Sequence, residues 1–223
     1  KLTMWFSVPS LILDMFKMKQ LKKNAFPSLK KSIFCGEALS STIVEKWQEA
    51  APNSIIDNLY GPTETTIAIM GYRWNRNLSI KECINGIVPI GKPFNGQKAS
   101  LIKSLNLGSK ENDELCLSGS QVFNGYLKNR RETSSKLFKT KNEKFWYKTG
   151  DIAKKDSSGN YVYLGRIDRQ IKVKGFRERF MLLALRPLSI TQVTKKSSMA
   201  GYKTSSTTRL KRCISSIKRT SSC

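Results

Sequence analysis

The first sixty residues alternate between apolar runs with strand character and segments whose apolar residues recur at the helical period of about 3.6 residues. The strand-like runs are residues 2–10, 29–34 and 55–59, and the helical segments are residues 11–18 and 41–47. Serines that can act as N-caps, Ser10 and Ser40, stand before the helical segments, and Pro52 follows the second one. This alternation predicts an α/β fold in which helices cover a parallel sheet.

Beyond residue 87 the pattern changes to short apolar runs separated by Gly, Asn and Pro. Such runs are typical of small antiparallel strands, so we expect a distorted antiparallel β-barrel subdomain. The expected strands of this region are residues 99–102, 114–119, 146–151, 160–165 and 171–174, and residues 128–136 are an expected basic helix. A further strand, residues 66–74, is expected before it, directly after the loop that follows residue 59. We expect the strand at 146–151 to end in a turn.

The loop from Asn58 to Thr66 reads Asn-Leu-Tyr-Gly-Pro-Thr-Glu-Thr-Thr and follows a predicted buried strand. It offers a ring that can stack on a base, a hydroxyl for phosphate oxygens and a carboxylate for a divalent metal. Ligands of open α/β sheets bind outside the carboxyl ends of the strands, where this loop falls. The alternative is an ordinary Gly-Pro turn followed by a capped helix, with Thr63 as the N-cap.

The net charge of +24 is compatible with an anionic partner, but its distribution argues against a nucleic-acid interface. The excess is scattered, and no zinc-finger, RNP or helix-turn-helix pattern accompanies it. Residues 181–223 hold nine basic residues, no acidic ones and fifteen Ser or Thr. We expect this tail to lack packed structure, with a basic tail for an anionic partner as the alternative.

The five cysteines include no C-x-x-C pair, and the chain has no histidine. These facts argue against a zinc site and against Ser-His or Cys-His catalysis. The cysteines are expected to be free thiols in a reducing compartment, the cytoplasm. No apolar run is long enough to span a membrane. The chain begins at Lys1 without Met or a signal-peptide pattern, so we expect it to be part of a longer protein.

Several motifs occur in a characteristic order. They are Phe34-Cys-Gly-Glu-Ala38, the Asn58–Thr66 loop, Asp113-Glu-Leu-Cys-Leu-Ser-Gly119 with Gly125-Tyr126, Tyr147-Lys-Thr-Gly-Asp151 and Gly165-Arg-Ile-Asp-Arg-Gln-Ile-Lys-Val-Lys-Gly-Phe-Arg177. Together they resemble the AMP-forming adenylation superfamily, which comprises acyl-CoA synthetases, luciferases and the adenylation domains of nonribosomal peptide synthetases. The resemblance covers residues 1–177.

The resemblance implies a ligase that uses ATP and Mg²⁺. A substrate carboxylate attacks the α-phosphorus of ATP, giving an acyl-adenylate and pyrophosphate. The acyl group then passes to the thiol of CoA or of a carrier protein's phosphopantetheine. Such chemistry needs positioning and charge stabilisation rather than a protein nucleophile, so the lack of histidine is no obstacle.

The resemblance also assigns residues to the nucleotide. The expected contacts to ATP are Asn58, Tyr60, Gly61, Thr63, Asp151 and Arg166. Tyr60 would stack on adenine and Asn58 would contact its edge, while Asp151 would bind the ribose hydroxyls. The catalytic set would be Thr63 on the α-phosphate, Glu64 on Mg²⁺ and Arg166 on the ribose and phosphate. Asp168 would be the hinge of a mobile C-terminal domain.

The acyl pocket is expected to be lined by Ile33, Cys35, Gly36, Leu59, Ile67 and Ala68. Pro62 is more typical of members that activate amino acids than of those that activate fatty acids. A fatty or aryl acid is the alternative substrate. The structural alternatives are that Tyr60 and the pocket residues form ordinary core, that Asp151 stabilises a turn, and that Arg166 and Asp168 form a surface ion pair.

The chain departs from the family pattern at both ends. The Ser/Thr/Gly-rich phosphate loop would precede Lys1, and no acidic amphipathic segment or catalytic lysine follows Arg177; Lys174 is not a safe substitute. We therefore expect an incomplete and inactive fragment, with a non-catalytic nucleotide-binding remnant as the alternative. The expected domains are 1–86 (part of the αβα core), 87–164 (β-barrel subdomain), 165–177 (hinge and start of the C-terminal domain) and 178–223 (aberrant tail).

Overall fold

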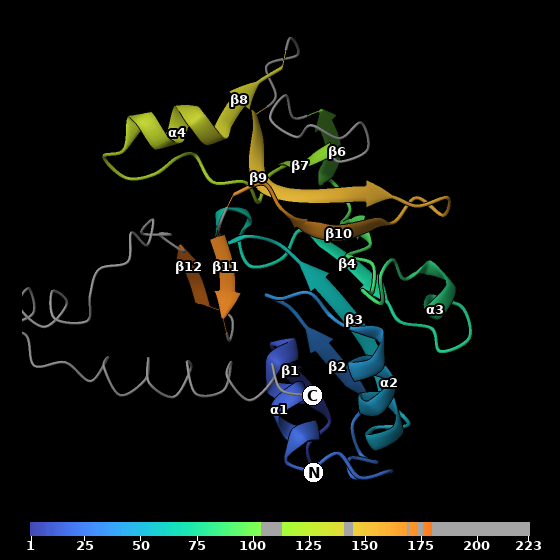
Figure 1. Ribbon diagram of the computed structural model, residues 1–223. Helices are drawn as coiled ribbons and strands as arrows, with labels where there is room; N and C mark the ends of the chain where they lie inside the picture. Colours follow the sequence, from blue (N-terminus) through green and yellow to red (C-terminus); the bar gives the residue numbers. More distant parts are fainter. Residues whose placement is uncertain (104–112, 141–144, 169, 174–175, 180–223) are drawn as a thin grey trace, which may run out of the picture. The chain divides into compact units, whose positions relative to one another are not determined.

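The computed structural model describes residues 1–103, 113–140, 145–168, 170–173 and 176–179 (Figure 1). Its first sheet contains β1 (Met4–Ser7), β2 (Lys31–Phe34), β3 (Ile55–Tyr60), β4 (Met70–Arg73) and β5 (Lys92–Pro93), in that order. β1, β2 and β3 are parallel, which confirms the predicted parallel sheet, and β4 and β5 extend it with antiparallel pairings.

Two helices, α1 (Pro9–Lys17) and α2 (Ser41–Ala50), connect the parallel strands and contact each other. Their apolar residues share one core with the strands; it includes Ile12, Phe34, Val44, Trp47 and Ile56. Trp47 is fully buried, and its indole Nε1 donates to Ser32 Oγ at 2.8 Å. The buried indole of Trp47 is therefore paired where α2 meets the sheet.

The opposite face of the parallel strands is open in the described part of the chain. On β1, Trp5 packs on the core, whereas its neighbours Met4 and Phe6 point the other way. The side chains of Met4 and Phe6 are both more than half exposed. Ile55 is likewise half exposed, whereas its neighbour Ile56 is buried. Both helices thus cover one side of these strands.

The second sheet is antiparallel, as predicted, with the order β10 (Tyr161–Arg166), β9 (Phe145–Lys155), β7 (Asp113–Ser118) and β6 (Lys98–Lys103). β8 (Leu137–Lys139) follows α4 (Arg130–Lys136) and pairs with β9. A second core draws on both sheets, including Tyr60 and Met70 from the first and Leu115 and Tyr161 from the second. Residues 1–180 accordingly form one compact unit.

Several local predictions were wrong. Ser10 lies inside α1 rather than at its N-cap, because Pro9 begins the helix and its fixed φ suits the first helical position. The strand expected at 66–74 is confined to β4, since Thr66 and Ile67 have positive φ. The strand expected to turn at 146–151 continues as β9 to Lys155.

Other elements differ in smaller ways. Pro62 rather than Thr63 is the N-cap of the 3-10 helix η1 (Thr63–Thr65). Helix α3 (Ser79–Glu82) was not predicted. A hairpin is formed by β11 (Gln170–Val173) and β12 (Phe176–Arg179). The predictions for Lys174 and the tail from residue 180 lie outside the described residues, and none of the described helices is long and apolar enough to cross a membrane.

A short bridge joins the two sheets. The amide of Ile90 donates to the carbonyl of Tyr161 at 2.8 Å, and the amide of Tyr161 donates to that of Gly91 at the same distance. Gly91 has φ +79°, and a Cβ there would lie 1.8 Å from the carbonyl oxygen of Gly71. The junction therefore requires glycine for space as well as for conformation.

Gly91→Ala should lower the free energy of unfolding by about 3 kcal/mol or more, because strain and overlap with backbone act together. Gly96→Ala is the matched control, since Gly96 also has φ +79° but nothing lies within 4 Å of its Cβ position. That variant should lose only about 1 to 2 kcal/mol. Urea unfolding followed by tryptophan fluorescence measures both values, and equal losses would contradict this account of the junction.

Candidate functional site

The loop after β3 is a compact turn built by its backbone. The amide of Ile69 donates to the carbonyl of Tyr60 at 2.9 Å and closes the loop, while η1 lies between them. Gly61 permits this closure, since a Cβ there would lie 2.6 Å from Ala68 Cα. Thr63 is exposed, whereas Glu64 is 9% exposed. The turn thus holds the predicted phosphate and metal residues side by side.

Asn58 is buried at the carboxyl end of β3, and its amide orientation is fixed. Its Nδ2 donates to the carbonyl of Pro89 at 2.9 Å. Its Oδ1 is buried and has no partner in the structure. A buried acceptor without a partner costs about 1 to 3 kcal/mol, so Oδ1 is suited to a ligand that brings a donor.

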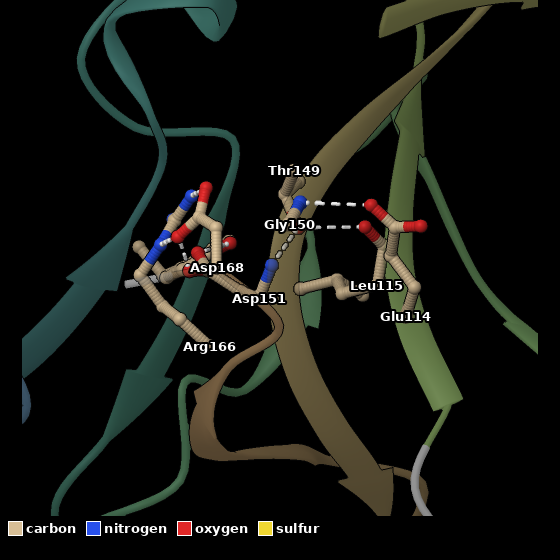
Figure 2. A network of polar contacts seen from close by, with 8 residues as sticks. Glu114, Leu115, Thr149, Gly150, Asp151, Arg166 and Asp168 are labelled. Atoms are coloured by element: carbon tan, nitrogen blue, oxygen red, sulfur yellow. Dashed lines mark hydrogen bonds and ion pairs between the residues drawn. The ribbon is translucent and has the colours of Figure 1, made fainter. Parts of the chain in front are cut away.

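A chain of polar contacts connects three motifs that are far apart in the sequence (Figure 2). Tyr60 Oη donates to Asp151 Oδ2, and Arg166 Nη1 donates to Asp151 Oδ1, each at 2.5 Å. The guanidinium also binds Asp168 in a bidentate manner, from Nε at 2.6 Å and from Nη2 at 2.8 Å. Both oxygens of Asp151 therefore accept hydrogen bonds from predicted nucleotide residues.

The strands hold this chain of contacts through bonds to their own backbone. Thr149 Oγ1 donates to the carbonyl of Leu115 at 2.7 Å and accepts from the amide of Asp151 at 3.0 Å. The amide of Gly150 donates to Glu114 Oε1 at 2.9 Å (Figure 2). The register of β7 against β9 shifts between Glu114 and Cys116. Irregular pairing of this kind is common where a strand must aim a functional side chain.

Electrostatics keep the two donors to Asp151 in their donating forms. Burial raises the pKa of the Tyr60 phenol well above its usual range, and the charge of Asp151 raises it further. Burial disfavours the charged form of Arg166, but hydrogen bonds to Asp168 and the charge of Asp151 outweigh this and raise its pKa. Tyr60 is thus a neutral donor and Arg166 a cation at neutral pH.

Glu64 is the predicted metal ligand, and its Oε1 accepts a hydrogen bond from Tyr126 Oη at 2.8 Å. No cluster of three or more His, Cys, Asp or Glu residues suited to a metal occurs in the described part of the chain. Mg²⁺ fits such a site, because proteins often bind it through one or two carboxylates together with substrate phosphates and water.

A cavity of about 330 Å³ lies beside the loop. It is lined by Phe6, Cys35, Gly36, Gly61, Thr63, Thr66 and Ile67. The predicted pocket residues Cys35, Gly36 and Ile67 thus meet there. Phe6 and Thr66 were missed, although Phe6 pairs in register with Ile33 on the neighbouring strand, which could have suggested it.

The other predicted pocket residues do not line this cavity. Leu59 lines a separate hollow with Asp57, Gly71, Tyr72, Arg73 and Phe94. Ala68 is a buried residue near the end of the loop, and its carbonyl accepts from Gln121 Nε2 at 2.9 Å. Ile33 lies between Phe6 and Asp57 in the sheet register. Cys83 and Cys116 are free thiols, as expected.

Residues 1–127, more than half of the chain, match the family described as AMP-binding enzyme. The chain belongs to the AMP-binding enzyme family. The sequence resemblance to the adenylation superfamily is therefore confirmed, and so is the α/β fold class drawn from it. The match includes the loop after β3 and ends just after Tyr126, so it covers the residues around Glu64.

Proteins that are similar to this chain include a carrier protein ligase and a peptide synthase. The chain is 35% identical over 178 residues to the D-alanine--D-alanyl carrier protein ligase of Staphylococcus epidermidis, covering 79% of the chain and 34% of the ligase. It is 38% identical over 155 residues to gramicidin S synthase 1 of Brevibacillus brevis, covering 67% of the chain and 13% of that protein.

A solved structure agrees with this family assignment. The Vibrio cholerae adenylation domain AlmE in complex with glycyl-adenosine-5'-phosphate matches with a TM-score of 0.70 and 36% identity. The match covers 79% of this chain and 33% of AlmE. This AMP-binding family member thus spans about a third of the length of the ligase and of AlmE.

Arg166→Met should lower the free energy of unfolding by about 3 kcal/mol, because it leaves the Asp151 carboxylate, 4% exposed, without its cationic partner. Arg73→Met is the control: Arg73 pairs with Asp57 but is 66% exposed, and Lys31 also contacts Asp57, at 3.0 Å. Its loss should be below about 1 kcal/mol. Urea unfolding of both variants tests the difference. Adding Asp151→Asn to Arg166→Met should recover stability, and a further loss would contradict the explanation.

Proposed function

We propose that this chain is the adenosine- and metal-binding part of an ATP-dependent ligase that activates a carboxylic acid, an amino acid in particular, as an acyl-adenylate. The observation that carries the proposal is the hydrogen-bonded chain Tyr60–Asp151–Arg166. Three residues expected at the nucleotide from separate motifs contact one another at β3, β9 and β10. If Tyr60 were only a core residue, Asp151 only part of a turn and Arg166 only part of a surface ion pair, their hydrogen bonds with one another would have no explanation.

Asn58 and Tyr60 would recognise the base. They are two residues apart on β3, so their side chains project from the same face. The buried Oδ1 of Asn58 is suited to accept from the 6-amino group of adenine, and Tyr60 would stack on the ring. The carboxylate of Asp151 would accept hydrogen bonds from both ribose hydroxyls, a charge-assisted pair.

Thr63, Glu64 and Arg166 would carry the chemistry. The exposed hydroxyl of Thr63 and the cationic Arg166 would stabilise charge that develops on the α-phosphate as the carboxylate oxygen attacks and pyrophosphate leaves. Glu64 would hold Mg²⁺, which supplies charge neutralisation on the phosphates when bound. Asp168, paired with Arg166, would be the hinge residue.

An amino acid is favoured over a fatty or aryl acid as substrate. The relatives include a D-alanyl carrier protein ligase, and the AlmE structure holds glycyl-adenosine-5'-phosphate. The cavity at Cys35, Gly36 and Ile67 would receive the acyl group. The acceptor would be the phosphopantetheine thiol of a carrier protein, with CoA as the alternative, and the setting would be the cytoplasm.

The domains expected from the sequence would each supply a different part of the site. Residues 1–86 would supply the adenine and metal loop, 87–164 the ribose carboxylate, and 165–177 the hinge. Because the chain spans about a third of the ligase and AlmE relatives, we propose that it binds nucleotide but has little activity alone. A purely non-catalytic nucleotide-binding remnant is the second candidate.

The orientation of Asn58 predicts discrimination between purines. ATP should bind at least about tenfold more tightly than ITP, since the 6-oxo group of hypoxanthine would place an acceptor against Oδ1 and leave both unpaired. Asn58→Ala should reduce the difference to about twofold. Isothermal titration in the presence of Mg²⁺ measures both, with circular dichroism as the check that the variant is folded. Equal affinities in the parent chain would contradict the assignment of Asn58.

Pyrophosphate release tests activity directly. The purified 223-residue chain, given ATP and a panel of amino, fatty and aryl acids, should bind ATP but show little turnover. Robust release with one acid would overturn the expected inactivity and identify the substrate. Titration of an oligonucleotide at two salt concentrations is the control, because tight salt-dependent binding without ATP binding would instead favour a third function, that of a basic nucleic-acid-binding module.

A further inference from the structure

The segment between β7 and α4 is hydrogen-bonded to the loop after β3 at several points. The amide of Phe123 donates to the carbonyl of Glu64 at 2.9 Å. Thr66 Oγ1 donates to the carbonyl of Gln121 at 3.1 Å. Together with the bonds from Gln121 to Ala68 and from Tyr126 to Glu64, these contacts tie the middle and the end of the loop, from Glu64 to Ala68, to one segment, residues 121–126.

Tyr126 is itself held from two sides. Its amide donates to Thr133 Oγ1 in α4 at 2.9 Å. Its ring packs edge-on against Phe123 with centroids 4.8 Å apart, and Phe123 packs in the same way on Tyr147 of β9 at 5.6 Å. The position of the Tyr126 phenol beside Glu64 is therefore fixed by contacts with helix α4 and, through Phe123, with strand β9.

A hydrogen bond to one carboxylate oxygen restricts the rotation of the carboxylate plane. Ligating carboxylates are themselves hydrogen-bonded as a rule, and loss of such an outer partner typically weakens metal binding by about 10- to 100-fold. Glu64 is 9% exposed, so water competes little for the contact with Tyr126. The geometry of this contact is that of an outer partner to a metal ligand.

We propose that Tyr126 is a positioning residue that holds the Glu64 carboxylate in the direction needed to bind a divalent cation. The contacts of residues 121–126 hold Tyr126 itself in place. This inference rests on the proposed function, in which Glu64 binds Mg²⁺ together with ATP. Tyr126 would not contact the nucleotide or the metal. Its effect is confined to the part of ATP affinity that depends on metal.

The test compares ATP affinity of the full 223-residue chain by isothermal titration with Mg²⁺ and with EDTA. Tyr126→Phe removes the hydroxyl but keeps the ring on Phe123. It should weaken Mg²⁺-ATP binding about tenfold and leave binding in EDTA unchanged. Tyr161→Phe is the matched control, because it removes a hydroxyl that donates to the carbonyl of Ala99 at 2.9 Å. This control should retain the parent's metal dependence.

A double-variant comparison separates positioning from a merely structural role. Glu64→Gln should abolish most of the metal dependence, and adding Tyr126→Phe should cause little further loss, because both act through one carboxylate. Full additivity, or a Tyr126→Phe loss of equal size in EDTA, would overturn the proposal while leaving ATP binding intact. Failure of the parent chain to bind ATP under either condition would instead overturn the proposed function, and this inference with it.

Discussion

The buried carboxylate of Asp151 is the group that the arrangement around the site must satisfy. A carboxylate removed from water needs cationic and hydrogen-bonding partners, and here they come from Arg166 on β10 and Tyr60 on β3. Because these strands belong to different sheets, satisfying one side chain fixes how the first sheet meets the second. The bridge between Gly91 and Tyr161 holds the same junction through the backbone. The contacts of Asp151 with Arg166 and Tyr60 therefore arrange the candidate site and also join the two sheets.

The loop after β3 divides its work between backbone and side chains. Its shape comes from the closeness of Gly61 to Ala68 and from the left-handed conformations of Thr66 and Ile67. The backbone bond from Ile69 to Tyr60 closes the turn, and Thr65 Oγ1 and Thr66 Oγ1 add bonds to the carbonyls of Pro62 and Gln121. The closing bonds therefore do not use the side chains of Thr63 and Glu64. This separation explains how a segment with so few residues can present several different functional groups at one strand end.

The parallel strands could be predicted from the sequence, and the ordered motifs singled out Tyr60, Asp151 and Arg166, but not the contacts that these residues make with one another. Periodicity revealed the strands, and the ordered motifs revealed the residues. Prediction from the sequence failed where two structural preferences compete. Helix α1 begins at Pro9 rather than after an N-cap at Ser10, and β4 is shorter than expected because Thr66 has a positive φ. Ile33, Leu59 and Ala68 were expected to line an acyl pocket but do not line the cavity beside the loop after β3, because sequence spacing alone does not show which way a pocket opens. The contact of Tyr126 with Glu64, 62 positions away, left no mark in either local pattern.

The open side of the parallel strands follows from handedness. The connections β1–α1–β2 and β2–α2–β3 both advance in the same direction across the sheet. Connections between parallel strands are right-handed in nearly all proteins, so two that advance the same way place both helices on one face. The side chains of Met4, Phe6 and Ile55 then face away from those helices and meet solvent in the described part of the chain. Their exposure is a consequence of backbone chirality and strand order, and no change in composition would move the helices to the other side.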